Sequence, residues 1–276
     1  MSILLINMDR FLLAMGLCVT LLRPCGAQLA PASEAGIRIG HVHLNVRSVE
    51  AHKKFWVEQV GAKAVRIGST EGVEIPGLLI LFRQQEPTGT VGGSVIDHLG
   101  LKVKNLDELI ASFQAAGSEV EKPRIGRENT PQTYVIGPDQ FRMELVEDPK
   151  IATPVISHHL HYFLAEPMAV KEWYVKTLPV APGMRGPYQA ADVPGINLTF
   201  APLSRAGATV AMKGRVMDHI GFEMKDLEAF CRRLEKSGVK LDSPYKKDAQ
   251  LGISTAYFTD PWGAYIELTE GLDRAH

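Results

Sequence analysis

The stretch His41-Val42-His43-Leu44-Asn45-Val46 alternates polar and apolar side chains, which is typical of a β-strand. Successive side chains of a strand point to opposite faces, so the three apolar residues share one face and the two histidines share the other. Imidazoles at neighbouring positions of one face are unusual in a half-buried strand, unless water or a ligand meets them. The stretch therefore predicts a strand with one core face and one face directed into a cavity.

This pattern is repeated along the chain. A second copy is His159-Leu160-His161-Tyr162, and shorter forms are Asp97-His98-Leu99-Gly100 and Asp218-His219-Ile220-Gly221. Each copy opens a unit of the order β-α-β-β-β, and the four units begin near Arg38, Ser94, Ser157 and Met217. Units one and two match units three and four at a nearly constant offset, which indicates a tandem duplication. We expect a first domain at 38–148 and a second at 155–271.

The composition is that of a globular protein. The chain has 276 residues, of which 45% are hydrophobic and 22% charged, with a formal net charge of −1. This allows a large core and does not suit disorder. Without a basic stripe or a long charge run, nothing favours a nucleic-acid partner or binding to a membrane surface.

The first residues have the pattern of an export signal. An apolar run at 11–22 is followed by Arg23 and then by the small residues Cys25 and Ala27. The run is too short to span a bilayer, which takes about 20 residues. We expect a signal peptide at 1–27, a linker at 28–37, and a mature protein that is periplasmic or secreted. The alternatives are a buried N-terminal helix and a misassigned start. Only Cys231 would remain after cleavage, which excludes an internal disulfide.

Cap and stop residues delimit the helices. Ser48 is a plausible N-cap for a helix that runs through Gln59 and stops at Gly61, and Gly117 and Gly238 end two later helices. The predicted helices are 49–59, 106–116, 167–178 and 227–237.

The repeat selects two histidines and one glutamate in each half. The two sets are His41, His98 and Glu144, and His159, His219 and Glu267. Two neutral imidazoles and one carboxylate facing one cavity are the ligand set of an open divalent-metal site for Zn, Mn, Ni or Fe. Three protein ligands leave adjacent positions free, so a substrate with two neighbouring oxygens can chelate the metal, which acts as a Lewis acid.

His43 and His161 face the same cavities, about 7 Å further along each strand. They could bind substrate, act as a base or orient a ligand. The alternative is that each is a polar part of the cavity wall.

At this point the residues resemble a known superfamily. The four modules, the Asp-His-Leu-Gly and Asp-His-Ile-Gly openings, and the stretch from Asp260 to Glu267 are similar to those of the vicinal oxygen chelate superfamily. It includes glyoxalase I, extradiol dioxygenases, methylmalonyl-CoA epimerase and bleomycin-resistance proteins. The resemblance covers about residues 39–270. It implies an α+β fold in which the βαβββ modules pair, one with two and three with four, into two curved-sheet half-barrels, each around a metal.

The resemblance also implies roles for residues, with departures. Glyoxalase I has a fourth ligand on the last strand of the odd module, and the matching stretches 79–82 and 197–200 contain no glutamate. Two histidines and a carboxylate are instead the set of the extradiol dioxygenases, whose substrate-binding tyrosine matches Tyr257 and, in the first half, Tyr134. Their additional acid/base histidine has no counterpart here.

The leading hypothesis is a divalent-metal-dependent lyase or isomerase that acts on a small molecule with vicinal oxygens. Candidate acid/base or substrate-contacting residues are His43, His161, Tyr134 and Tyr257. One alternative is an Fe(II) extradiol-type dioxygenase, and another is a non-catalytic small-molecule binder of the bleomycin-resistance type. The duplication suits a monomer or a homodimer.

Overall fold

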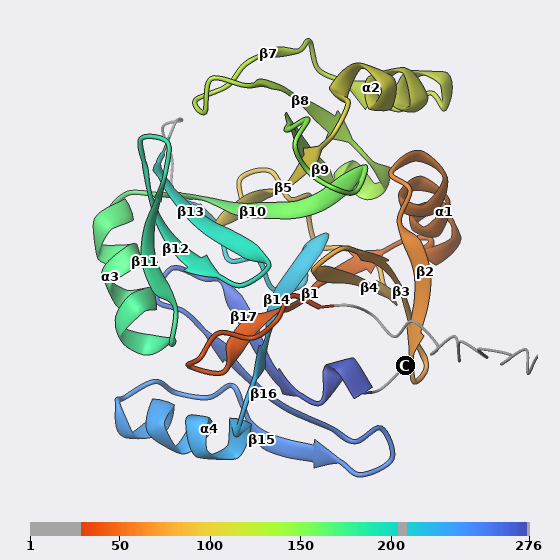
Figure 1. Cartoon of the computed structure of the whole chain (residues 1–276). Helices are drawn as coiled ribbons and strands as arrows, with labels where there is room; N and C mark the ends of the chain where they lie inside the picture. Colours follow the sequence, from red (N-terminus) through yellow and green to blue (C-terminus); the bar gives the residue numbers. More distant parts are fainter. Residues whose placement is uncertain (1–28, 204–208, 275–276) are drawn as a thin grey trace, which may run out of the picture.

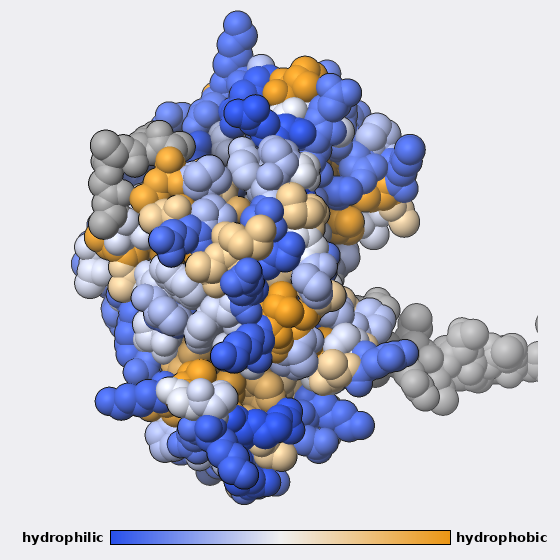
Figure 2. All heavy atoms as spheres, turned by 90° about the vertical axis from the view of Figure 1, so that its left-hand side faces the viewer, coloured by the Kyte–Doolittle hydropathy of each residue, from blue (hydrophilic) through white to orange (hydrophobic). Residues whose placement is uncertain are grey.

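The computed structural model describes residues 29–203 and 209–274, so the expected signal peptide lies outside the described residues. Two mixed sheets occupy the centre of the molecule and the four α-helices lie on the outside (Figure 1). On the face drawn in Figure 2, apolar side chains are scattered among hydrophilic ones. Within the described ranges, no helix is both long and apolar enough to cross a membrane. The predicted α+β class is confirmed.

The first two units contain β1 to β9. Unit one has β1 (Ile37–Val46), α1 (Val49–Lys54) continued by the π-helix η1 (Phe55–Gln59), β2 (Lys63–Ile67), β3 (Thr70–Ile75) and β4 (Leu78–Gln84). Unit two has β5 (Ile96–Val103), α2 (Leu106–Ala115), β6 (Glu119–Val120), β7 (Arg124–Ile125), β8 (Pro131–Ile136), the 3-10 turn η2 (Pro138–Gln140) and β9 (Arg142–Glu147).

The last two units repeat this order. Unit three has β10 (Val155–Leu164), α3 (Pro167–Thr177), β11 (Ala181–Arg185), β12 (Tyr188–Val193) and β13 (Ile196–Pro202). Unit four has β14 (Met217–Met224), α4 (Leu227–Lys236), β15 (Ser243–Asp248), β16 (Ile253–Thr259), β17 (Tyr265–Glu270) and the short η3 (Leu272–Arg274).

The helix ends follow the residues that predicted them. The Ser48 hydroxyl accepts a hydrogen bond from the Ala51 amide at 3.2 Å, as an N-cap should. Beyond α2 and α4, Gly117 and Gly238 adopt φ of 78° and 91°, a left-handed conformation that glycine adopts without strain. The predicted helices therefore begin and end within about two residues of those observed.

The pairing of the units differs from the prediction. The eight-stranded sheet runs β15-β16-β17-β14-β1-β4-β3-β2 and so combines units one and four. The nine-stranded sheet joins units two and three, in the order β11-β12-β13-β10-β5-β9-β8-β6 with β7 beside β8. The centre of each sheet is an antiparallel pair, β1 with β14 and β5 with β10. The expectation that units one and two would close one sheet is wrong.

Consecutive units instead pack through their helices. The ring of Phe55 in η1 lies 5.5 Å from that of Phe113 in α2, and Trp56 lies 5.6 Å from Phe141, which precedes β9. All four side chains are almost completely buried. Burial of these large apolar surfaces favours contact between the first two units through their helices, outside the sheets. The edge of β1 that does not pair with β4 is then free to pair with β14.

Candidate metal centres

The two sheets each bring four chemically active side chains to one point. The first group, named here the β1/β14 site, consists of His41, His43, His219 and Glu267. The second, named the β5/β10 site, consists of His98, Glu144, His159 and His161. Within each group the candidate ligand atoms all lie within 4.8 Å of one another, and every residue is buried.

All six predicted ligands are in these groups, but their distribution differs from the prediction. His41 was expected with His98 and Glu144, and it lies instead with His219 and Glu267. The reason is the sheet pairing, because β1 is adjacent to β14 and not to β5. Compared with the prediction, His41 and His159 have changed places, so that His159 lies with His98 and Glu144.

At the β1/β14 site one carboxylate oxygen meets two imidazoles. Glu267 Oε2 is 2.9 Å from His41 Nε2 and 2.9 Å from His219 Nε2. The ring of His43 is tilted against that of His219, with the centroids 4.6 Å apart. Strand register explains the convergence, since His43 is opposite His219 and Glu267 is beside Gly221.

The β5/β10 site repeats this arrangement. Glu144 Oε2 is 3.0 Å from His159 Nε2 and 3.5 Å from His98 Nε2, and the two imidazole nitrogens are 3.4 Å apart. Ligands bound at roughly 2.1 Å are separated by about 3.0–3.4 Å in octahedral or tetrahedral coordination. The observed spacings match the edges of such a polyhedron at both sites.

An aspartate holds one histidine of each site. His98 Nδ1 is 2.8 Å from Asp97 Oδ1, and His219 Nδ1 is 2.7 Å from Asp218 Oδ2. A carboxylate on one ring nitrogen fixes the tautomer and leaves Nε2 with its lone pair toward the cluster. These aspartates belong to the repeated Asp-His dipeptide, which was the signal for them in the sequence.

A glycine two residues after each of these histidines makes room for the facing ring. A Cβ on Gly100 would overlap the imidazole of His159, and one on Gly221 would overlap that of His41. The register places each glycine directly beside that histidine on the adjacent strand. The Asp-His-x-Gly pattern therefore serves one ligand of its own strand and one ligand of the strand paired with it.

Several buried ring nitrogens lack a partner among the described residues. In the two clusters they are His43 Nε2, both ring nitrogens of His161, and His41 Nδ1, and outside the clusters His52 Nδ1. Unpaired buried polar atoms are destabilising by about 1–3 kcal/mol each. A bound cation, or a molecule held by it, would satisfy the atoms that face the clusters. The donor set, two or three imidazoles and one carboxylate, fits a divalent metal ion.

The pKa shifts differ among the histidines of the two clusters. Burial lowers the pKa of His98 and His219, but hydrogen bonds to the neighbouring aspartate and glutamate outweigh it, so the net pKa of both is raised and each would give up a proton more reluctantly to a metal. Burial lowers the pKa of His161 to about 2, with His98 and Arg185 acting in the same direction, and burial likewise holds the pKa of His43 well below its usual value. Burial raises the pKa of Glu144, but hydrogen bonding to His159 and His98 outweighs it, and the net pKa is lowered. Neutral imidazole and ionised carboxylate are the forms that bind metals.

The two candidate tyrosines lie beside the glutamates. Tyr134 is in register with Glu144, and Tyr257 with Glu267. Burial, aided by the neighbouring carboxylate, raises the pKa of each phenol well above its ordinary value. Both phenols are therefore protonated donors at neutral pH, which argues against either tyrosine as the general base.

The β5/β10 site adjoins a cavity. A cavity of about 440 Å³ reaches Glu144 and His161 of the β5/β10 site, and Arg185 lines it. Arg185 Nη2 is 3.4 Å from Glu144 Oε2, and the Gln132 amide donates to Glu144 Oε1. Sequence reasoning missed both residues because units one and four have no arginine or glutamine at the matching positions.

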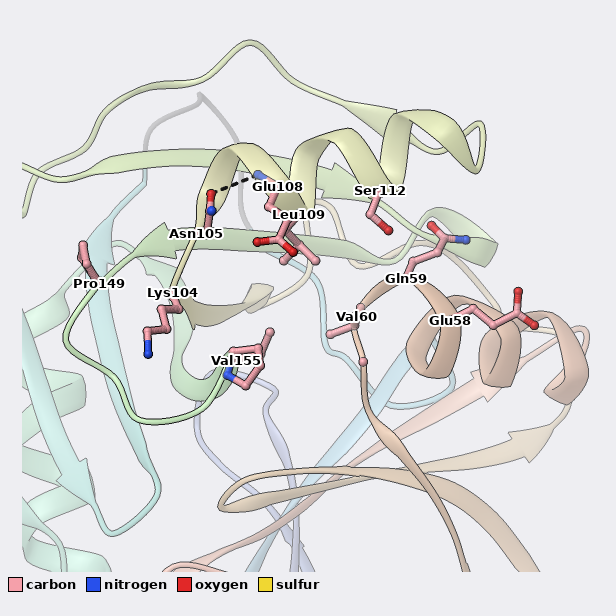
Figure 3. A pocket seen from close by; sticks show the side chains of 12 residues that line it. Glu58, Gln59, Val60, Lys104, Asn105, Glu108, Leu109, Ser112, Pro149 and Val155 are labelled. Carbon is pink, nitrogen blue, oxygen red and sulfur yellow. Dashed lines mark hydrogen bonds between the residues drawn. The ribbon is translucent and has the colours of Figure 1, made fainter.

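A larger groove of about 640 Å³ lies between η1 and α2, and Figure 3 shows its lining side chains. Glu58 and Glu108 contribute carboxylates, Lys104 contributes an amine, and none of the lining residues is a histidine or cysteine. The groove is a gap between units one and two, at a distance from the clusters, and it holds no comparable set of metal donors.

Comparison with known proteins agrees with this fold. The chain belongs to the Glyoxalase/Bleomycin resistance protein/Dioxygenase superfamily, whose model matches residues 38–150 and again 125–268. The resemblance stated from the sequence is thereby confirmed. No curated protein sequence matches the chain.

Solved structures that cover most of this chain have the same fold. Glyoxalase I from Zea mays superposes with a TM-score of 0.70 at 15% identity, covering 86% of this chain and 94% of that protein. A putative dioxygenase from Bacillus subtilis subsp. subtilis str. 168 has a TM-score of 0.65 at 15% identity, with 86% of each chain covered. At these identities the likeness concerns the fold.

Proposed function

We propose that the protein is a divalent-metal-dependent enzyme that acts on a small molecule with two neighbouring oxygens. His41, His219 and Glu267 would hold one metal ion, and His98, His159 and Glu144 the other. The observation that carries the proposal is the double convergence of two buried imidazoles and one buried carboxylate, each with an aspartate that orients one of the histidines.

The chemistry divides between the metal and the residues around it. A bound divalent metal supplies Lewis acidity toward the chelating oxygens of the substrate. His161 and His43 are uncharged and have unpaired ring nitrogens, so they can add to the ligand set or accept a hydrogen bond from a bound substrate. Their lowered pKa makes them weak bases. Tyr134 and Tyr257 can donate a hydrogen bond to a developing oxyanion. Polarisation of the substrate oxygens by a metal, with a hydrogen-bond donor beside them, suits a lyase or an isomerase.

Metal analysis tests the proposal. The measurement is plasma mass spectrometry of the protein purified without chelator or nickel affinity, for the wild type, Glu144→Ala, Glu267→Ala and the double variant. About two metal ions per wild-type chain and about one in each single variant are expected, because each glutamate serves one site. A wild type that stays metal-free after incubation with Zn, Mn, Ni and Fe would contradict the proposal and revive the small-molecule binder.

An Fe(II) dioxygenase is the second candidate, favoured by the tyrosine beside each glutamate. The structural similarity to a putative dioxygenase is consistent with it but concerns the fold alone. Oxygen uptake by iron-reconstituted protein with a catechol distinguishes the two reactions. Uptake that depends on Tyr134 or Tyr257 would support ring cleavage, and its absence with active Zn or Mn protein would support the lyase or isomerase.

The proposal includes export of the mature chain, from about residue 28, to the periplasm or the outside. An exported protein would hold Zn, Mn or Ni more readily than Fe(II). N-terminal sequencing of the protein recovered from the host in which it is naturally made checks the cleavage, and a cytoplasmic chain with an intact first residue would contradict it.

A further inference from the structure

The two candidate metal sites have matching ligands but different surroundings. In the β5/β10 site, the strand beside the ligand histidines places Asn197 next to His159 and Thr199 next to His161. In the β1/β14 site the same two positions are Leu79 and Leu81. At these two positions the wall of the β1/β14 site is apolar. At the next position along the strand it has Arg83, where the β5/β10 site has Ala201.

The difference continues outward from the ligands. Leu79 and Leu81 belong to a buried apolar cluster whose other members are Leu29, Ile67, Ile253 and Leu272. The turn between β2 and β3 meets the turn between β15 and β16, where Gly68 is in contact with Leu251. Apolar side chains thus line part of the concave side of this sheet.

One position shows the contrast directly. Arg185 ends β11 opposite Tyr188, and its counterpart Ile67 ends β2 opposite Thr70. Ile67 is part of the apolar cluster, whereas the Arg185 guanidinium is buried with its Nη2 at 3.4 Å from Glu144 Oε2. A buried guanidinium beside a metal ligand is destabilising unless anions surround it.

The charges around the cavity are unbalanced. Three arginines line it, Arg124, Arg127 and Arg185, and among its lining residues Glu144 is the one carboxylate. Glu128 approaches Arg185 Nε at 2.7 Å, and Glu121 Oε2 lies 3.8 Å from Arg124 Nη1, so both glutamates compensate part of the charge. Arg127 is exposed and has no ion-pair partner among the described residues. A divalent metal would add two positive charges, so the cavity attracts anions.

The remaining walls are apolar. The ring of Phe163 stacks on that of His161 at 4.7 Å, Tyr188 approaches the same imidazole edge-on, and Ile125 is 63% exposed at the cavity. A planar guanidinium pairs well with a carboxylate, and aromatic walls pack against a flat apolar group. The arginines therefore suit a carboxylate at one end of a ligand, and the aromatic walls suit a flat apolar group at its other end.

We propose that the β5/β10 site alone receives substrate, that this substrate is a small carboxylate with an apolar or aromatic part, and that Arg185 binds its anionic end. Arg124 and Arg127 attract the anion at the mouth. The β1/β14 site has Leu79 and Leu81 at the positions of Asn197 and Thr199, and Ile67 at that of Arg185, so it lacks the groups that would bind this anion. This inference rests on the proposed function and adds the substrate class and the working site.

Isothermal titration of the full-length, zinc-loaded protein tests it. The probes are benzoate, an aromatic carboxylate, and benzamide, its uncharged analogue of the same shape. One benzoate should bind per chain although two zinc ions are present, and benzamide should bind at least about tenfold more weakly because a charge-assisted pair is lost. Two benzoates per chain, or equal affinity for the two probes, would overturn the inference.

Variants separate recognition by arginine from binding to the metal alone. Arg185→Met should weaken benzoate at least about tenfold and benzamide little, while Arg185→Lys should restore part of the affinity. If Arg185→Met fails to fold, Arg127→Ser, an exposed position, should still weaken benzoate by about threefold. The matched control is Lys246→Ser, because Lys246 faces Thr255 as Arg124 faces Gln132, and it should leave benzoate binding unchanged.

The outcomes distinguish the two proposals. A chain that takes up no zinc contradicts the proposed function. A chain that takes up two zinc ions but binds benzoate equally well in wild type, Arg185→Met and Arg127→Ser contradicts this inference alone.

Discussion

Each Asp-His-x-Gly stretch positions two ligands of the site it belongs to. The aspartate fixes the tautomer of its neighbouring histidine, and the glycine leaves space for an imidazole from the facing strand. Asp218 is itself held by the Asn45 amide at 3.0 Å and the Gly214 amide at 2.7 Å, and Asp97 is held by Arg142. Residues that do not bind the metal themselves, Asp97 and Asp218, thus set the orientation of the neighbouring ligand histidines.

Removing the aspartate charge should weaken metal binding without unfolding the protein. Asp97→Asn should lower the affinity of the β5/β10 site for zinc by about 10- to 100-fold, and Asp218→Asn that of the β1/β14 site, because the amide no longer stabilises the same tautomer. Competition with a chromophoric chelator measures the affinity. Equal affinity in variant and wild type would show that the aspartates are only structural.

Replacing either glycine of the Asp-His-x-Gly stretches by alanine should remove the metal from one site and leave the other site intact. Gly100→Ala should displace His159 and empty the β5/β10 site, and Gly221→Ala should displace His41 and empty the β1/β14 site. Metal content per chain is the readout. Gly92→Ala is the control, since a Cβ there would meet only the Thr90 hydroxyl at 3.8 Å. Full metal content in both site variants would contradict the proposed ligands.

A turn in each even-numbered unit forms hydrogen bonds to the helix of the preceding unit or to a residue just before it. Asp139 in η2 accepts a hydrogen bond from the Arg47 amide at 2.9 Å and lies 3.1 Å from His52 Nε2 in α1. In the second half, Asp260 of the turn before β17 accepts from the Tyr174 hydroxyl of α3 at 2.8 Å. These contacts join units one and two, and units three and four, although each pair is divided between the sheets.

The His52 contact should make stability depend on pH. Burial lowers the pKa of His52, and Asp139 opposes the shift only in part, so the folded protein binds the proton less readily than the unfolded chain. The free energy of unfolding should therefore fall as the pH drops below about 6.5. His52→Gln keeps a donor to Asp139 but does not titrate. The variant should therefore lose less stability between pH 7 and pH 5 than the wild type does. Denaturant titrations at both pH values measure this, and parallel losses would contradict it.

For the molecule as a whole, the sequence predicted the four units and the types of ligand, but not which units share a sheet. Caps, glycines and strand alternation are local signals, and the duplication singled out His41, His98 and Glu144 with their counterparts. Units two and four are equivalent in sequence pattern, however, so β5 and β14 are equally good partners for β1. The choice depends on how the aromatic faces of the helices pack, which a one-dimensional pattern does not contain. Arg185 was missed for a related reason, because its counterpart Ile67 breaks the repeat.

The same equivalence leads to a prediction for half of the chain. A fragment of residues 29–150 contains β1 and β5, and β1 should pair with β5 of a second copy as it pairs with β14 in the full chain. The fragment should form a dimer with two metal ions, each between His41 of one copy and Glu144 of the other. Light scattering and metal analysis test this, with Glu144→Gln as a metal-free dimer control. A metal-binding monomer would show that units one and two can close a site by themselves.

The interleaved pairing also sets the order in which the chain can complete its fold. Unit three follows unit two directly, so the sheet built on β5 and β10 can assemble from the middle of the chain. In contrast, β1 has only β4 for a neighbour until β14 at the far end has been made. Pairing between such distant segments is slow, and an unpaired strand edge attracts other chains meanwhile. The nascent protein therefore carries an open edge through most of its synthesis, and the last quarter of the chain protects the first.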